Sequence, residues 1–209
     1  MPLPMILFAV DLLIISLYGF HLALGGRPEM FNLNGEMNLG AWWGGGKFLL
    51  ASAAVASIPV FFKDKRSDLR GLYWTVAIGF AWLSADEILA LHERITKYNK
   101  AYELGLPMFR ETNGAWIGVY AVIFVILVLI FLRPLLNSIK DDPKSARLVA
   151  AGFAVLVSGA VVAEVLGYFQ LLGGMASPLQ VFIEESLELF GVSTILLGCV
   201  SHAVWVSQQ

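Results

Sequence analysis

Charged and sulfur-bearing residues are scarce in this sequence, and their scarcity excludes several classes of protein. Only 14% of the 209 residues are charged, 58% are hydrophobic, and the mean hydropathy is +0.74. Soluble domains carry about 25% charged residues, so this composition is typical of a membrane protein with several spans. The net charge is −2 and long basic runs are missing, which argues against a nucleic-acid partner. A lone Cys199 rules out an internal disulfide and an all-thiolate metal site.

Six apolar segments are long enough to cross a hydrocarbon core about 30 Å thick, which takes about 20 helical residues. They are residues 5–24, 42–62, 72–91, 116–136, 148–172 and 181–206. Lipid cannot satisfy the backbone N–H and C=O groups, so each segment is expected to be an α-helix. The sequence therefore predicts an all-α polytopic bundle of six transmembrane helices, forming a single membrane domain over residues 1–209.

The orientation of the bundle follows from Lys and Arg in the connections, which favour the cytoplasmic side. Eight of these residues flank the connections on one side and five lie in those on the other. The first set is Lys63, Lys65, Arg66, Arg70, Arg133, Lys140, Lys144 and Arg147, and the second is Arg27, Arg94, Lys97, Lys100 and Arg110. This bias predicts that both termini are cytoplasmic. The protein is expected to lie in a bacterial inner (plasma) membrane.

Two connections expected on the outer side resemble each other. Residues 26–31 read Gly-Arg-Pro-Glu-Met-Phe before a Gly-Ala-Trp at 40–42, and residues 105–109 read Gly-Leu-Pro-Met-Phe before a Gly-Ala-Trp at 114–116. Tandem hairpin repeats would explain this similarity. Membrane-interface loops also accumulate Gly, Pro and Trp independently, so both interpretations remain open.

Clusters of ionisable residues interrupt two of the apolar segments. Residues 84–93 read Ser-Ala-Asp-Glu-Ile-Leu-Ala-Leu-His-Glu, and residues 184–188 read Glu-Glu-Ser-Leu-Glu. Charge in hydrocarbon is costly, so ionisable groups within a span indicate a functional site whose members pair with one another. We expect the rest of the chain to bring these two clusters together.

The depth of each polar group can be estimated from a rise of about 1.5 Å per residue on straight helices. The groups at about 20–24 Å from the inner edge are His21, Lys47, Asp86, Glu87, Glu164 and Glu188. Asp11 falls at about 9 Å, and His202 lies near the inner edge. Five helices thus place a polar group at a matching height, which predicts a site in the outer leaflet, facing the outer side.

Carboxylate and imidazole side chains of this kind suit a divalent metal such as Fe, Mn or Zn. The predicted ligands are Asp86, Glu87, His92, Glu164, Glu185 and Glu188, with His21, Glu93 and Glu184 as additional candidates. Lys47 is expected to be a charge partner of a carboxylate. The Glu-x-x-His spacing of two-metal helix bundles is missing before His92 and His21, so this prediction rests on residue types alone.

Three functions remain open. The leading hypothesis is a membrane enzyme, in which a redox metal oxidises a lipid or small apolar substrate or zinc hydrolyses it. The second is transport of protons or cations by the same carboxylates, with Asp11 and His202 as polar groups on the cytoplasmic side. The third is a structural subunit or assembly factor of a membrane complex. The expected partners are the lipid bilayer and an apolar substrate, and the composition is also compatible with an oligomer.

Overall fold

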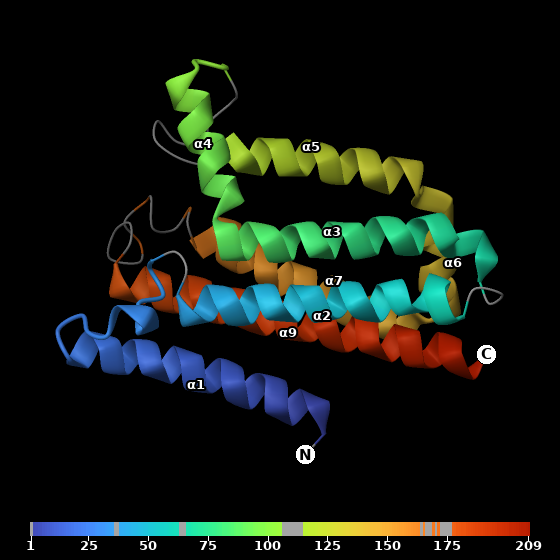
Figure 1. The fold of residues 1–209 in the computed structure, drawn as a ribbon, viewed down its shortest axis with the longest axis horizontal. Helices are drawn as coiled ribbons and strands as arrows, with labels where there is room; N and C mark the ends of the chain where they lie inside the picture. The colour runs from blue at the N-terminus through green and yellow to red at the C-terminus, as the bar shows by residue number, and fades with distance from the viewer. Residues whose placement is uncertain are drawn as a thin grey trace.

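The computed structural model describes residues 2–35, 38–62, 66–105, 115–163, 165, 169, 171 and 177–209. Among these residues every regular element is a helix, and the longer helices run side by side (Figure 1). The α-helices are α1 (Leu3–Ala23), α2 (Leu39–Phe61), α3 (Arg70–Leu89), α4 (Leu91–Ala101), α5 (Ala115–Ile130), α6 (Leu132–Asp141), α7 (Pro143–Val157) and α9 (Pro178–Gln208). Short 3₁₀ helices cover Glu29–Phe31 and Ser67–Leu69, and a π-helical turn covers Ser158–Ala163.

Four of the described helices are long and apolar enough to cross a membrane: α1, α2, α9 and the stretch Pro143–Val161 that begins with α7. The pair α5 and α6, bent by 75°, would be a fifth if it forms one span. The all-helical prediction is therefore confirmed for the described residues, and four or five candidate spans are found where six were expected. The helix that does not qualify is α3, because Asp86 and Glu87 in its last turns lower its hydropathy.

Two of the expected spans have different bounds in the structure. Segment 72–91 is broken at Ala90, which has φ of 51° in the left-handed region that residues other than glycine rarely adopt. The chain then leaves α3 steeply as α4 (Figure 1). Segment 148–172 begins earlier, at Pro143, and most of its residues after 163 lie outside the described part. The repeat hypothesis also stays untested, since residues 106–114 lie outside it.

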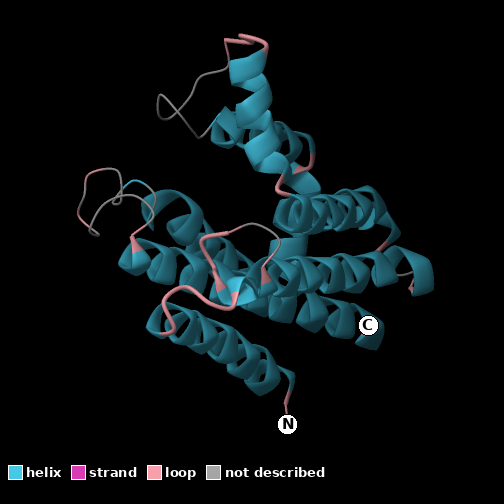
Figure 2. Cartoon of the chain, turned by 60° about the vertical axis from the view of Figure 1, so that its left-hand side comes forward, coloured by secondary structure: helices cyan, strands magenta, loops and turns pink. Residues whose placement is uncertain are grey.

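The centre of the bundle is formed by α2, α3, α7 and α9. Figure 2, coloured by secondary structure, shows the described chain as helices joined by loops. Ala51, Ile58 and Ile195 are wholly buried there. Glycines bring α7 and α9 together: a Cβ on Gly152 would lie 2.7 Å from the Gly191 carbonyl oxygen, and one on Gly191 would lie 2.6 Å from the backbone nitrogen of Leu156. Small residues that allow backbones to approach closely are typical of helix packing in membranes.

Two helices lie at the periphery of this centre. Helix α1 begins partway along the bundle, well short of the end where α9 terminates (Figure 1). Helix α5 runs beside α3 with a visible separation and is joined to the rest mainly through α4 and α6 at its two ends. The separation of α5 from the bundle matters for the site.

Candidate functional site

A cavity of about 1140 Å³ extends along the faces of α3, α5, α7 and α9 that point toward one another. Its wall is mostly aliphatic and aromatic, with Val76, Phe80, Leu83, Phe124, Leu127, Val128, Val149, Phe153 and Leu156 among the lining residues. Tyr73 and Asp86 both line it, and they lie 13 residues apart on α3, which corresponds to about 20 Å. The cavity therefore follows the bundle axis over a large part of an apolar core about 30 Å thick.

One end of the cavity carries most of the predicted site residues. We call it the carboxylate end and define it as Asp86, Glu87, His92, Glu184, Glu185 and Glu188, all of which line the cavity. The first three come from the junction of α3 and α4, and the glutamates come from the first turns of α9. The two acidic clusters, about 100 positions apart in sequence, thus face one space.

The break at Ala90 positions His92 over Asp86. The His92 backbone N–H donates to Asp86 Oδ1 at 2.6 Å, and the His92 ring nitrogen Nδ1 lies 3.3 Å from Asp86 Oδ2. A continuous helix would leave these residues on different faces of the helix, so the left-handed turn is what brings them together. Asp86 is only 7% exposed, and its contact with the imidazole compensates part of its burial.

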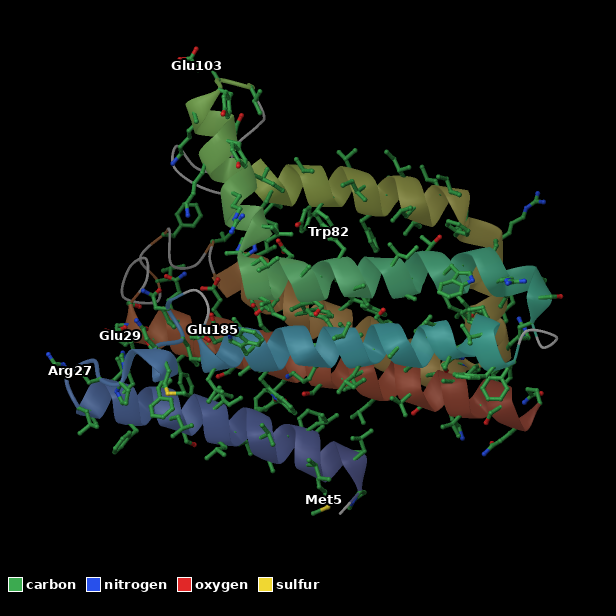
Figure 3. The ribbon with its side chains drawn as sticks, viewed as in Figure 1. Met5, Arg27, Glu29, Trp82, Glu103 and Glu185 are labelled. Carbon is green, nitrogen blue, oxygen red and sulfur yellow. The ribbon has the colours of Figure 1, made fainter. Side chains whose placement is uncertain are left out.

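Aromatic side chains attach α5 to this end. The His92 and Trp116 rings meet edge to face at 5.4 Å, and Trp116 meets Tyr120 in the same way at 5.8 Å. Trp82, which points from α3 toward α5 (Figure 3), donates its indole N–H to the Tyr120 hydroxyl at 3.2 Å. On its α5 side the carboxylate end is therefore bordered by aromatic side chains that also carry N–H and hydroxyl groups.

The glycine-rich start of α2 leaves space for two of the glutamates. A Cβ on Gly44 would lie 3.2 Å from Glu87 Oε1, and one on Gly40 would lie 3.8 Å from Glu185 Oε2. Figure 3 shows Glu185 beside the first turns of α2. This role of the glycines was not predicted, although their grouping over residues 40–46 is a visible signal in the sequence.

The remaining predicted ligands lie elsewhere. His21 is at the end of α1, where its Nδ1 lies 3.0 Å from the Pro28 carbonyl oxygen and its ring stacks on Tyr18. Glu164 and the side chain of Glu93 lie outside the described residues. Within the described part of the chain, no three His, Cys, Asp or Glu side chains are placed to hold a metal ion. The divalent metal therefore stays a prediction.

Lys47 and Asp11 form a separate buried network. Lys47 Nζ donates to Asp11 Oδ1 at 2.8 Å, to the Leu189 carbonyl at 2.7 Å and to Ser193 Oγ at 3.1 Å, and Trp43 donates to Asp11 at 2.6 Å. The depth estimates of about 9 Å for Asp11 and about 22 Å for Lys47 assumed that all helices start at one edge. The direct contact shows that Asp11 and Lys47 lie at a similar depth in the bundle. The depth estimate for Asp11 was wrong because α1 begins partway along the bundle.

The opposite end of the cavity carries a cluster of polar side chains, only some of which were predicted from sequence. We call it the Tyr73 end, formed by Tyr73, Asp142, Ser145 and His202, all lining the cavity. His202 Nδ1 lies 3.0 Å from Asp142 Oδ2, and His202 Nε2 lies 3.1 Å from the Tyr73 hydroxyl. Asp142 is the N-cap of α7 and accepts the Ser145 backbone N–H at 3.2 Å.

Asp142 lies between the candidate spans, and its surroundings favour the ionised carboxylate. Burial acts to raise its pKa, but hydrogen bonds from the Ser145 side chain, His202 and the Ser145 backbone together outweigh burial, so the pKa lies below its ordinary value. Of this group only His202 was singled out from sequence. A carboxylate just before Pro143 is a recognisable helix start, but no local pattern links it to a histidine 60 residues later.

The comparisons with known proteins give a family but no characterised relative. No match was found among curated proteins or among solved structures. Residues 5–203 match a family described as a domain of unknown function, DUF8692, and the chain belongs to that family.

Proposed function

We propose that this membrane protein binds an elongated apolar, lipid-like molecule in the cavity between α3, α5, α7 and α9. The carboxylate end then acts on the end of that molecule that lies beside it. The observation that carries the proposal is a cavity of about 1140 Å³ with a mostly apolar wall and ionisable residues at its ends. Ligand cavities usually measure about 300–1,000 Å³ and combine an apolar wall with a few polar groups.

A divalent cation at the carboxylate end is the second part of this proposal. Asp86 and His92 supply an oxygen and a nitrogen 3.3 Å apart, and Glu184, Glu185 and Glu188 line the same space. Mixed oxygen and nitrogen ligands suit Fe, Mn or Zn. A redox metal would support oxidation of the bound molecule, and zinc would support its hydrolysis through an activated water.

The membrane placement belongs to the proposal as well. The excess of Lys and Arg flanking connections 63–70 and 133–147 supports cytoplasmic termini, and we place the protein in a bacterial inner membrane. The carboxylate end, at the other end of α3 and α9, would then face the outer leaflet. An apolar molecule could enter from the bilayer beside α5, which is attached mainly at its ends.

Transport of protons or cations is the second candidate, and one observation favours it. The same cavity reaches from Asp86 to His202, so ionisable groups stand at both ends of one space. The wall between them is mostly apolar, however, and a bare charge crossing it would be poorly solvated. The apolar wall therefore favours an apolar occupant.

A matched pair of glycine substitutions tests the proposal. Gly79 lines the cavity and a Cβ there would meet no atom within 4 Å, so Gly79→Leu can direct added bulk into the cavity without a clash at its Cβ. Gly46 in α2 is equally open but is not part of the cavity wall, so Gly46→Leu is the control. The measurement is saturation binding of tritiated 1-methoxyhexadecane to the detergent-purified protein.

We expect one molecule bound per chain. The affinity should fall about tenfold or more in Gly79→Leu, as for overpacking of a filled site, and should not change in Gly46→Leu. Binding that does not saturate, or that is equal in the two variants, would contradict the proposal.

A further inference from the structure

Three polar side chains from distant parts of the chain form a hydrogen-bonded series at the Tyr73 end. Tyr73 comes from α3, His202 from α9 and Asp142 from the junction of α6 and α7. The contacts are 3.1 Å from the Tyr73 hydroxyl to His202 Nε2 and 3.0 Å from His202 Nδ1 to Asp142 Oδ2. The Trp205 ring stacks on the His202 ring at 5.6 Å and holds its plane.

The direction of these hydrogen bonds follows from Asp142. An ionised carboxylate can only accept, so His202 Nδ1 must carry the proton that it donates to Asp142. In the neutral imidazole Nε2 is then an acceptor, and the Tyr73 hydroxyl donates to it. Tyr73 has given its only proton to this bond, so its oxygen offers the cavity lone pairs alone. The series therefore accepts a hydrogen bond from a ligand and transmits the polarisation toward Asp142.

Other charged groups near this end are engaged with one another. Arg66 lies 2.6 Å from Asp141 and 3.8 Å from Asp68. The Asp142 carboxylate is also held by the Ser145 backbone N–H. The start of α7 therefore fixes the position of the Asp142 carboxylate. The carboxylate in turn orients the His202 ring, in the same way that a carboxylate orients the histidine of a hydrolase triad.

We infer that Tyr73, His202 and Asp142 form a second polar site that binds the hydroxyl group of an elongated aliphatic molecule and polarises its O–H bond toward His202. The inference deepens the proposed function and rests on it, because the hydroxyl reaches Tyr73 only when the aliphatic part occupies the cavity. Tyr73 is the contact residue, and His202 and Asp142 are positioning residues. The bound class is a long-chain alcohol, since an ether or alkane of equal length has no proton to donate.

The test compares tritiated 1-hexadecanol with 1-methoxyhexadecane, which has the same chain and no O–H donor. Wild-type protein should bind the alcohol about two- to tenfold more tightly, the net effect of one hydrogen bond. Tyr73→Phe should remove this preference and leave ether affinity unchanged. Because Phe keeps the ring, packing around the cavity is retained, and His202→Gln provides a second variant if Tyr73→Phe does not fold.

Tyr120→Phe is the matched control, because Tyr120 also lines the cavity but lies at the carboxylate end. It should keep the preference for the alcohol. Equal binding of alcohol and ether by wild-type protein would overturn the inference and leave the cavity proposal standing. Loss of the preference in Tyr120→Phe but not in Tyr73→Phe would move the hydroxyl to the carboxylate end and also overturn it. Failure of both probes to bind would overturn the proposed function itself.

Discussion

Lys47 Nζ lies 2.8 Å from Asp11 Oδ1, and both side chains are fully buried where α1, α2 and α9 meet. Ser193 donates to the other oxygen of Asp11, and the Leu189 carbonyl accepts from Lys47. Each charge therefore has an opposite charge and further hydrogen bonds, which is the condition for burying an ion pair. Neither residue lines the cavity, so the pair serves to attach α1 to the bundle.

Removing one member of this pair should destabilise the protein more than removing both. Lys47→Met leaves Asp11 buried without its cation, and such losses cost about 3–5 kcal/mol. The double variant Lys47→Met with Asp11→Leu replaces both charges by apolar groups and should recover much of the loss. Thermal unfolding of the purified variants, followed by intrinsic fluorescence, gives the comparison. If the double variant is less stable than Lys47→Met, the expectation is wrong and the ion pair contributes a net stabilisation.

The membrane class and most helix positions could be predicted from sequence, because they depend on the length and hydropathy of local segments. The contact between Asp11 and Lys47 could not be predicted in the same way. It depends on how far α1 is shifted along the bundle, and periodicity within one helix carries no information about its axial position relative to another. Equal starting depths for all helices were therefore the wrong assumption for α1.

The candidate site could likewise be predicted only in part. The acidic residues at 86–87 and 184–188 were predicted to meet, because charged groups within spans need polar surroundings, and they do line one cavity. The turn at Ala90 and the series from Tyr73 to Asp142 were not predicted. Both depend on tertiary contacts: a left-handed alanine has no sequence signature, and Tyr73 and His202 are 129 residues apart.

Packing between α7 and α9 should be sensitive to a single methyl group. In Gly191→Ala the new Cβ would lie 2.6 Å from the Leu156 backbone nitrogen, and backbone cannot move aside as a flexible side chain can. We expect a loss of about 1–3 kcal/mol, as for overpacked cores. The control is Gly46→Ala, where the Cβ meets nothing within 4 Å and the higher helix propensity of alanine should be neutral or slightly stabilising. Equal melting temperatures in the two variants would argue against close backbone contact.

Acidification should weaken the Tyr73 end through Asp142. Its pKa is lower in the folded protein than its ordinary value, so folding favours the ionised form. The resulting stability is fully present above an unfolded pKa of about 4 and is lost as the pH falls through the folded pKa. The melting temperature of wild-type protein should therefore fall more steeply below about pH 4 than that of Asp142→Asn.

The exposed Asp68 supplies the control for this pH dependence, because its side chain is 61% exposed and surface ion pairs contribute little. Asp68→Asn should follow the wild-type curve. Parallel curves for wild type and Asp142→Asn would show that Asp142 does not contribute to the acid sensitivity.

Metal content should depend on both halves of the carboxylate end. If a divalent cation is bound there, Asp86→Ala and Glu185→Ala each remove a ligand from a different helix, and metal affinity should fall by well over tenfold, since even the loss of an outer-shell partner costs 10- to 100-fold. His21→Gln is the control, because His21 contacts the Pro28 carbonyl away from the cavity. Elemental mass spectrometry of the purified protein, without added metal, measures the stoichiometry of Fe, Mn and Zn in all four proteins. Near-stoichiometric metal in wild type and His21→Gln, lost in the other two, would establish a shared site. Wild-type protein without metal would contradict the metal part of the proposal and would leave the binding of an aliphatic molecule in the cavity unaffected.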